Sequence, residues 1–162
     1  MRETLDVDTF DLKLLAALEA DGRLTTAELA ERVALSASQC SRRRQRLEEA
    51  GIIRRYRAEL DPGALGFGVT AFVRVALAAH SRENARRFRE LVATLDPIQE
   101  AHALTGEADY LLKIIVSDLK ALSELLNDVL LPHEAVATVR SSIVLETLKD
   151  AGRLPLKAGA RR

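Results

Sequence analysis

Two helix-start signals stand close together in the first third of the sequence. Residues Thr25–Glu28 have the pattern of a capping box, in which a hydroxyl and a carboxylate each accept a backbone N–H. Residues Ser36–Gln39 repeat that pattern, and Gly51 supplies a helix stop signal. We therefore predict a helix over residues 26–33 and a second helix that runs from Ser36 to Gly51. Two helices joined by so short a turn are typical of a helix-turn-helix.

Positive charge is concentrated on the second of these helices and just beyond it. The whole chain has a formal net charge of zero. Residues 36–57 nevertheless carry seven arginines against two glutamates, whereas residues 1–35 carry eight acidic and four basic side chains. A local basic block in a neutral protein is typical of a surface that meets phosphate groups. The alternative is a solvated helix face with surplus arginine, and composition alone gives the two equal weight.

The helix that begins at Ser36 has the composition of a recognition helix. Hydroxyl and amide side chains near its start can reach base edges or phosphates, and arginines can bind guanine or the DNA backbone. Cys40 and Leu47 are spaced to face the domain core, so we interpret Cys40 as a small buried hydrophobe rather than a redox site. The candidate DNA-binding residues are Ser36, Ser38, Gln39, Ser41, Arg42, Arg43 and Arg46.

After Gly51 the sequence pattern changes. Residues 52–60 are too few and too rich in β-formers for another helix, so we predict an extended connector strand. Strand and helix patterns then alternate, with strands over 69–78, 98–104, 109–116 and 136–145 and helices over 82–95 and 118–131. The order βαββαβ predicts a ferredoxin-like antiparallel sheet with both helices on one face. Apolar positions on its other face predict sheet-to-sheet dimerisation.

These patterns predict an α+β protein with an N-terminal winged-type helix-turn-helix domain and a C-terminal ferredoxin-like domain. We place the first over residues 1–51, the linker strand and turn over 52–65, the second domain over 66–150 and a basic tail over 151–162. No apolar stretch is long enough to span a membrane, and no signal peptide is visible, so we expect a cytoplasmic protein without a membrane partner. The single cysteine excludes an internal disulfide, and no metal site or cofactor is expected.

The run from Leu35 to Ile53 resembles the signature of the Lrp/AsnC regulators, also called feast/famine proteins. Segments Thr105–Lys113 and Ser141–Leu145 fit the same family, so the resemblance covers nearly the whole chain. One departure is Arg44, where the family usually has a valine. Position 44 lies near the core-facing stripe of its helix. Its guanidinium either extends outward beside the core or joins the phosphate-facing residues, and both alternatives stay open.

The resemblance implies a transcription regulator that binds double-stranded DNA and that responds to an amino acid or related metabolite at its subunit interfaces. It also implies a homodimer that assembles further, to an octamer in similar proteins. The turn at Gly106 fits effector binding, because glycine permits close approach of a ligand and Asp109 can receive an ammonium group. The alternative is that these two residues only build a tight β-turn. The candidate effector-binding residues are Thr105, Gly106, Asp109, Tyr110, Ser141 and Ser142.

Two other functions share part of these sequence features. An architectural DNA-wrapping protein would use the same helix and the same assembly without an effector. Siroheme decarboxylases look similar in both halves, but they need basic and histidine residues around a tetrapyrrole and have less need for a basic recognition helix. The sequence has no nucleophile elbow, P-loop or GxGxxG motif. We therefore expect a regulator with no catalytic residues. Connector strands of two chains are expected to pair and to place two recognition helices roughly 34 Å apart.

Overall fold

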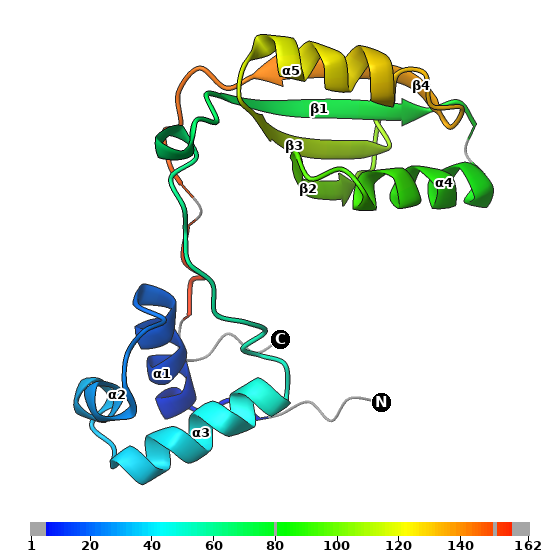
Figure 1. The fold of residues 1–162 in the computed structure, drawn as a ribbon. Coiled ribbons are helices and arrows are strands. Elements are labelled where there is room, and N and C mark those ends of the chain that lie inside the picture. The colour runs from blue at the N-terminus through cyan, green and yellow to red at the C-terminus, as the bar shows by residue number, and fades with distance from the viewer. Residues whose placement is uncertain (1–5, 80, 151, 157–162) are drawn as a thin grey trace. The chain divides into compact units, whose positions relative to one another are not determined.

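The computed structural model of the chain describes residues 6–79, 81–150 and 152–156 (Figure 1). The chain divides into two units, Met1–Glu59 together with Lys149–Arg162, and Leu60–Leu148. Of the predicted basic tail over 151–162, residues 151 and 157–162 lie outside the described residues. Within the described part of the tail, the backbone N–H of Leu154 donates to the Glu19 carboxylate at 2.8 Å. No helix in these described ranges is long and apolar enough to cross a membrane.

The first unit contains three helices, α1 (Thr9–Ala20), α2 (Thr26–Val33) and α3 (Ala37–Glu49). Both predicted capping boxes are confirmed, and a third, formed by Asp8 and Asp11, begins α1. The turn between α2 and α3 is tight because Ala34 adopts a left-handed conformation with φ of 56°. The core of this unit is made of buried aliphatic side chains and the buried Cys40; its members are Leu14, Leu18, Leu24, Leu29, Val33, Cys40 and Leu47.

The second unit contains a four-stranded antiparallel sheet with the strand order β2-β3-β1-β4. Its elements are β1 (Val69–Leu77), α4 (Arg82–Ala93), β2 (Ile98–Ala103), β3 (Tyr110–Val116), α5 (Leu119–Glu124) and β4 (Val136–Ile143). The predicted helix over 118–131 is confirmed, but its second half, Leu125–Leu130, is π-helical. This arrangement is the predicted ferredoxin-like fold.

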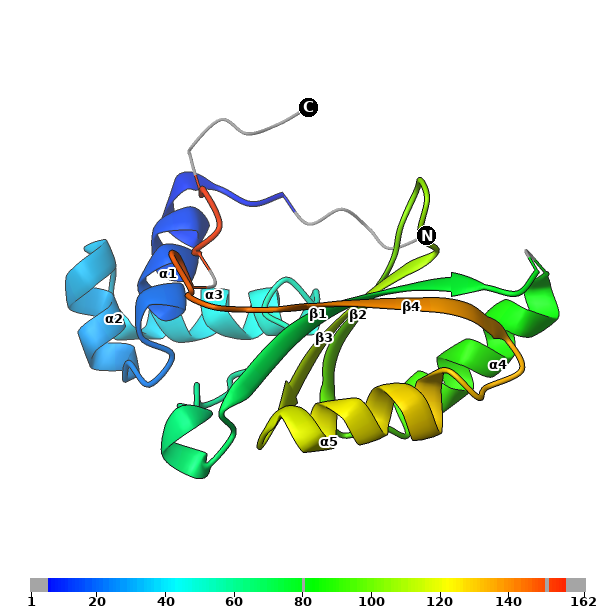
Figure 2. The same ribbon diagram turned by 90° about the horizontal axis from the view of Figure 1, so that it is seen from above.

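Helices α4 and α5 lie on one side of the sheet and leave the other side open (Figure 2). Strand β1 shows the alternation, since Val73 and Val75 are fully buried whereas Phe72 and Arg74 are exposed. Under the helices, the ring of Phe88 packs on that of Tyr110 with 4.7 Å between the ring centres. The side chains of the open face are therefore available to ligands or to another subunit.

The connector between α3 and β1 differs from its predicted form. Residues 54–60 form no regular secondary structure in the single chain, and a short 3₁₀ turn follows at Gly63–Leu65. An isolated strand has no partner for its backbone N–H and C=O groups. Pairing of this segment with its counterpart in a second chain therefore stays a prediction.

Candidate DNA-binding helix and ligand pocket

The first turn of α3 is occupied by its own cap. The hydroxyl of Ser36 accepts from the backbone N–H of Gln39 at 3.3 Å, and the Gln39 side chain accepts from the N–H of Ser36 at 3.2 Å. The Ser38 hydroxyl lies 3.1 Å from that of Ser36. Two of the predicted DNA-binding residues, Ser36 and Gln39, thus start the helix and fix its direction.

One flank of α3 is bound to α1 through a buried carboxylate. Asp11 has a fully buried side chain, yet it accepts from Arg43 Nη1 at 2.8 Å and from Arg46 Nη2 at 2.5 Å. Arg43 also donates to Asp8 at 2.7 Å, and its guanidinium lies over the ring of Phe10. The hydrogen bond to Asp11, followed by that to Asp8, raises the pKa of Arg43. We call Asp8, Asp11, Arg43 and Arg46 the α1–α3 clamp.

The opposite flank of α3 carries Arg44. Its Nε donates to Glu48 at 3.0 Å, and its guanidinium lies 4.8 Å from the ring centre of Tyr56 in the connector. The Tyr56 hydroxyl donates to the same Glu48 oxygen at 2.8 Å. The pKa of Glu48 is lowered by the hydrogen bond from Arg44 and then by that from Tyr56. Arg44 therefore contacts the connector.

The remaining face of α3 points to solvent. Ser38, Ser41, Arg42 and Gln45 recur at helical spacing and are all exposed. Gln45 donates to Glu49 at 2.8 Å, whereas Arg42 has no hydrogen-bond or ion-pair partner among the described residues. The run of arginines on α3 thus points in three directions, and Arg42 is the guanidinium that this outward face offers to a phosphate or a guanine base.

The α1–α3 clamp was not predicted from the sequence. The carboxylate of Asp11 lies 32 and 35 residues from its two arginines, and sequence patterns resolve pairing only over a few residues. The usable signal is Asp11 itself, because a carboxylate on the apolar stripe that contains Leu14 and Leu18 needs a cationic partner. Among the described residues, no group of His, Cys, Asp and Glu side chains is arranged to hold a metal ion.

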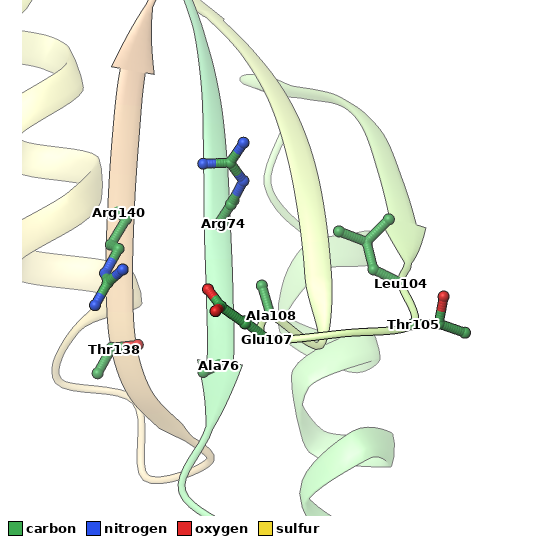
Figure 3. Close-up of a pocket in the computed structure, with 8 residues that line it drawn as sticks. All are labelled: Arg74, Ala76, Leu104, Thr105, Glu107, Ala108, Thr138 and Arg140. Carbon is green, nitrogen blue, oxygen red and sulfur yellow. The ribbon is translucent and has the colours of Figure 1, made fainter.

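A pocket of about 830 Å³ lies on the open face of the sheet beside the β2–β3 hairpin (Figure 3). Arg74 of β1 and Arg140 of β4 stand opposite each other in register and project into it. Two like charges directly opposite on neighbouring strands repel each other, so this pair favours an anion between them. The lining residues are Arg74, Ala76, Leu104, Thr105, Glu107, Ala108, Thr138 and Arg140.

Of the six predicted effector-binding residues, Thr105 lines this pocket. Gly106 lies in the same hairpin with φ of 121°, and the Asp109 carboxylate accepts from the backbone N–H of Leu77 at 2.7 Å. Tyr110 is buried against Phe88.

The two predicted serines lie on β4. Ser141 is in register with Val73, on the helix-covered side, and Ser142 with Phe72, on the open side. Thr105, Gly106 and Asp109 therefore share the hairpin beside the pocket, whereas Tyr110, Ser141 and Ser142 are not among its lining residues. The arginine pair was missed because the sequence does not give the register of β1 against β4.

Family profiles match both halves of the chain. The profile described as Lrp/AsnC ligand binding domain matches residues 70–154, and that described as Winged helix-turn-helix DNA-binding matches residues 7–54. The chain is 40% identical over 147 residues to a leucine-responsive regulatory protein of Rhizobium meliloti, covering 91% of this chain and 94% of that protein. It is 38% identical over 152 residues to the leucine-responsive regulatory protein of Escherichia coli K12, covering 94% and 93%.

Solved structures share the fold. A transcriptional regulator of Neisseria meningitidis, solved as an L-Met complex, has a TM-score of 0.90 at 42% identity, over 93% of this chain and 97% of that chain. A feast or famine regulatory protein of Mycobacterium tuberculosis, complexed with L-methionine, has a TM-score of 0.82 at 30% identity, over 94% and 100%. The resemblance is confirmed, and this chain belongs to the Lrp/AsnC family of transcription regulators.

Proposed function

We propose that this regulator binds double-stranded DNA through the outward face of α3 and binds an amino acid in the pocket on the open face of the sheet. The observation that carries the proposal is the three-way division of the α3 arginines. Arg43 and Arg46 are bound to Asp11, Arg44 is bound to Glu48, and Arg42 is left exposed beside hydroxyl and amide groups. That outward surface combines phosphate-binding and base-reading groups.

Within this proposal the predicted DNA-binding residues have two roles. Ser38, Ser41 and Arg42 contact the duplex, because their side chains are exposed on the outward face of α3. Ser36 and Gln39 cap the helix, and Arg43 and Arg46 hold it against α1. Such support keeps the contacting side chains in place without adding a phosphate contact of its own.

The chemistry of the pocket supports an amino-acid effector. The guanidinium groups of Arg74 and Arg140 suit the carboxylate, and the Glu107 carboxylate suits the ammonium. The apolar side chains of Leu104 and Ala108 suit an aliphatic side chain. The two neighbouring structures that hold L-methionine make methionine the first ligand to test.

The open face also supports the proposed homodimer. Phe72 and Leu104 each expose about two fifths of their surface there, beside the half-buried Leu111 and Ile115. A second copy packed on this face would bury them and would stand at the rim of the ligand pocket. Effector binding and assembly would then be linked, and dimers would associate further, to an octamer. We propose no catalytic role, and we place the protein in the cytoplasm, where its DNA lies.

A ligand and DNA screen of the full chain tests this function. Thermal shifts against the twenty amino acids identify the effector, and each hit is repeated by size-exclusion chromatography. Selection of bound genomic fragments, with competitor DNA present, measures the specificity ratio. The proposal expects enriched sites and at least one amino acid that shifts both stability and assembly. Tight DNA binding without sequence preference or ligand response would instead indicate an architectural DNA-wrapping protein.

A further inference from the structure

We propose that Arg44, Tyr56 and Glu48 form a connector clasp that sets the spacing between the two DNA half-sites read by a dimer. The inference rests on the proposed DNA-binding function. The clasp is built from a guanidinium and a carboxylate on α3 and a phenol in the connector, with the contacts of 3.0, 2.8 and 4.8 Å given above. Arg44 and Glu48 are positioning residues, because they act on DNA through the connector.

Tyr56 also lies close to Gly22. A Cβ placed on Gly22, in the turn between α1 and α2, would lie 3.4 Å from Cδ1 of Tyr56. The ring is therefore close both to that turn and to the guanidinium of Arg44. Burial, followed by the hydrogen bond to Glu48, raises the pKa of Tyr56. The side chain of Tyr56 thus contacts α3 and lies beside the turn at Gly22.

The clasp determines the residue at which the connector leaves the DNA-binding unit. Ile52 and Ile53 are held by backbone hydrogen bonds to the carbonyl of Leu47, and Ile53 packs against the core. With the clasp closed, the chain is held to the unit as far as Tyr56. With the clasp open, the chain is held to the unit only as far as Ile53, so residues 54–56 add about 10 Å of reach.

That extra reach matters for half-site spacing. One base pair of B-DNA advances about 3.4 Å along the helix axis, so 10 Å corresponds to about three base pairs. A dimer reads two half-sites at a separation that its own geometry fixes. A connector released at Ile53 instead of Tyr56 therefore tolerates half-sites that are closer together or farther apart.

Arg44 supplies two of the three contacts of the clasp. A valine at this position, which the resemblance to the Lrp/AsnC regulators implies as the usual residue, can neither donate to Glu48 nor place a cation over the ring of Tyr56. A cation against an aromatic face together with a shared carboxylate acceptor gives Tyr56 one defined position.

The test is a selection of duplexes from a random-sequence pool, performed with the full wild-type chain, Arg44→Val and Tyr56→Phe. Sequencing of the bound duplexes gives the half-site sequence and the distribution of half-site spacings. Arg32→Val is the matched control, because Arg32 is an exposed helical arginine outside the clasp. Circular dichroism checks that each variant is folded, and Tyr56→Phe keeps the ring while it removes only the hydroxyl.

We expect one dominant half-site spacing for the wild-type chain and for Arg32→Val. We expect Arg44→Val to broaden the distribution of half-site spacings by up to about three base pairs and to leave the half-site sequence unchanged. Tyr56→Phe should broaden the distribution less. An unchanged spacing distribution for Arg44→Val would overturn the clasp, as would a changed half-site sequence, which would make Arg44 a DNA contact. Failure of the wild-type chain to enrich any motif would overturn the proposed DNA binding itself.

Discussion

Arg43 Nη1 lies 2.8 Å from Oδ1 of Asp11, a carboxylate that is fully buried at the start of α1. The same carboxylate completes the capping box of α1, because its other oxygen accepts from the backbone N–H of Asp8 at 3.1 Å. One side chain therefore both begins the first helix and holds the recognition helix. The orientation of α3 is determined by this charge pair as well as by apolar packing.

Removal of the Asp11 carboxylate should destabilise the DNA-binding unit. We expect Asp11→Ala to lower the free energy of unfolding by about 2–3 kcal/mol, because it leaves Arg46 without its acceptor, leaves Arg43 with Asp8 alone and removes the acceptor of the Asp8 backbone N–H. Arg43 and Arg46 keep some access to water, which limits the loss. Urea unfolding followed by helix circular dichroism measures the change. Glu31→Ala, at an exposed position of α2, is the control and should stay within about 0.5 kcal/mol. Equal effects of the two substitutions would contradict the clamp.

The raised pKa of Tyr56 predicts a loss of stability at alkaline pH. Its folded-state pKa lies above the ordinary value of 10.0, because of burial and then of the hydrogen bond to Glu48. The stabilising contribution is therefore fully present below that ordinary value and is lost as pH rises through the folded-state pKa. Tyrosinate absorbance, recorded in a Tyr110→Phe background, gives the midpoint for Tyr56. Glu48→Ala should lower this midpoint, and a midpoint that stays where it was would show that Glu48 does not hold the phenol.

Gly106 should be sensitive to any side chain, whatever its size. Its φ of 121° is unfavourable for L-residues, whereas a Cβ at this position would meet no atom within 4 Å. We expect Gly106→Ala and Gly106→Leu to destabilise the chain by similar amounts, about 1–3 kcal/mol, and to abolish any methionine-induced thermal shift. Gly63→Ala, without a positive φ, serves as the comparison in the same thermal unfolding experiment. A Leu variant far less stable than the Ala variant would show that space rather than backbone conformation is limiting.

The arginine pair should dominate effector affinity. Loss of one charge-assisted hydrogen bond costs about 1.5–3 kcal/mol, so Arg140→Gln should weaken methionine binding at least about tenfold. Lys113→Gln is the matched control, since Lys113 lies on the same open face but is bound to Glu100 outside the pocket. Calorimetric titration measures both. If methionine binds the wild type and both variants equally well, effector binding stands and its site lies elsewhere.

The elements of this fold were predictable because their signals are local. Thr25, Ser36 and Asp8 start helices through contacts within three residues, and these patterns are visible in the sequence. The alternation of Tyr110, Leu112 and Ile114 likewise marks a strand with one buried face. The same alternation explains why Tyr110 faces the core, although the sequence places it among the candidate effector-binding residues.

The partners of charged residues were not predictable in the same way. A count of arginines over 36–57 gives a basic block, but it does not tell which of them are neutralised by the protein. Asp11 lies far away in sequence from Arg43, and the facing of Arg74 and Arg140 depends on strand register. The position of α3 can thus be predicted from the sequence, whereas the arginines that remain exposed on it are known only from the tertiary structure.

The salt dependence of duplex binding by Arg42→Gln and Arg43→Gln tests the central claim most directly. Each lost phosphate contact reduces the slope of log affinity against log salt by about 0.9. With a duplex selected by the wild-type chain, the account predicts a reduced slope for Arg42→Gln and an unchanged slope for folded Arg43→Gln. The opposite result, a wild-type slope for Arg42→Gln and a reduced slope for Arg43→Gln, would contradict it.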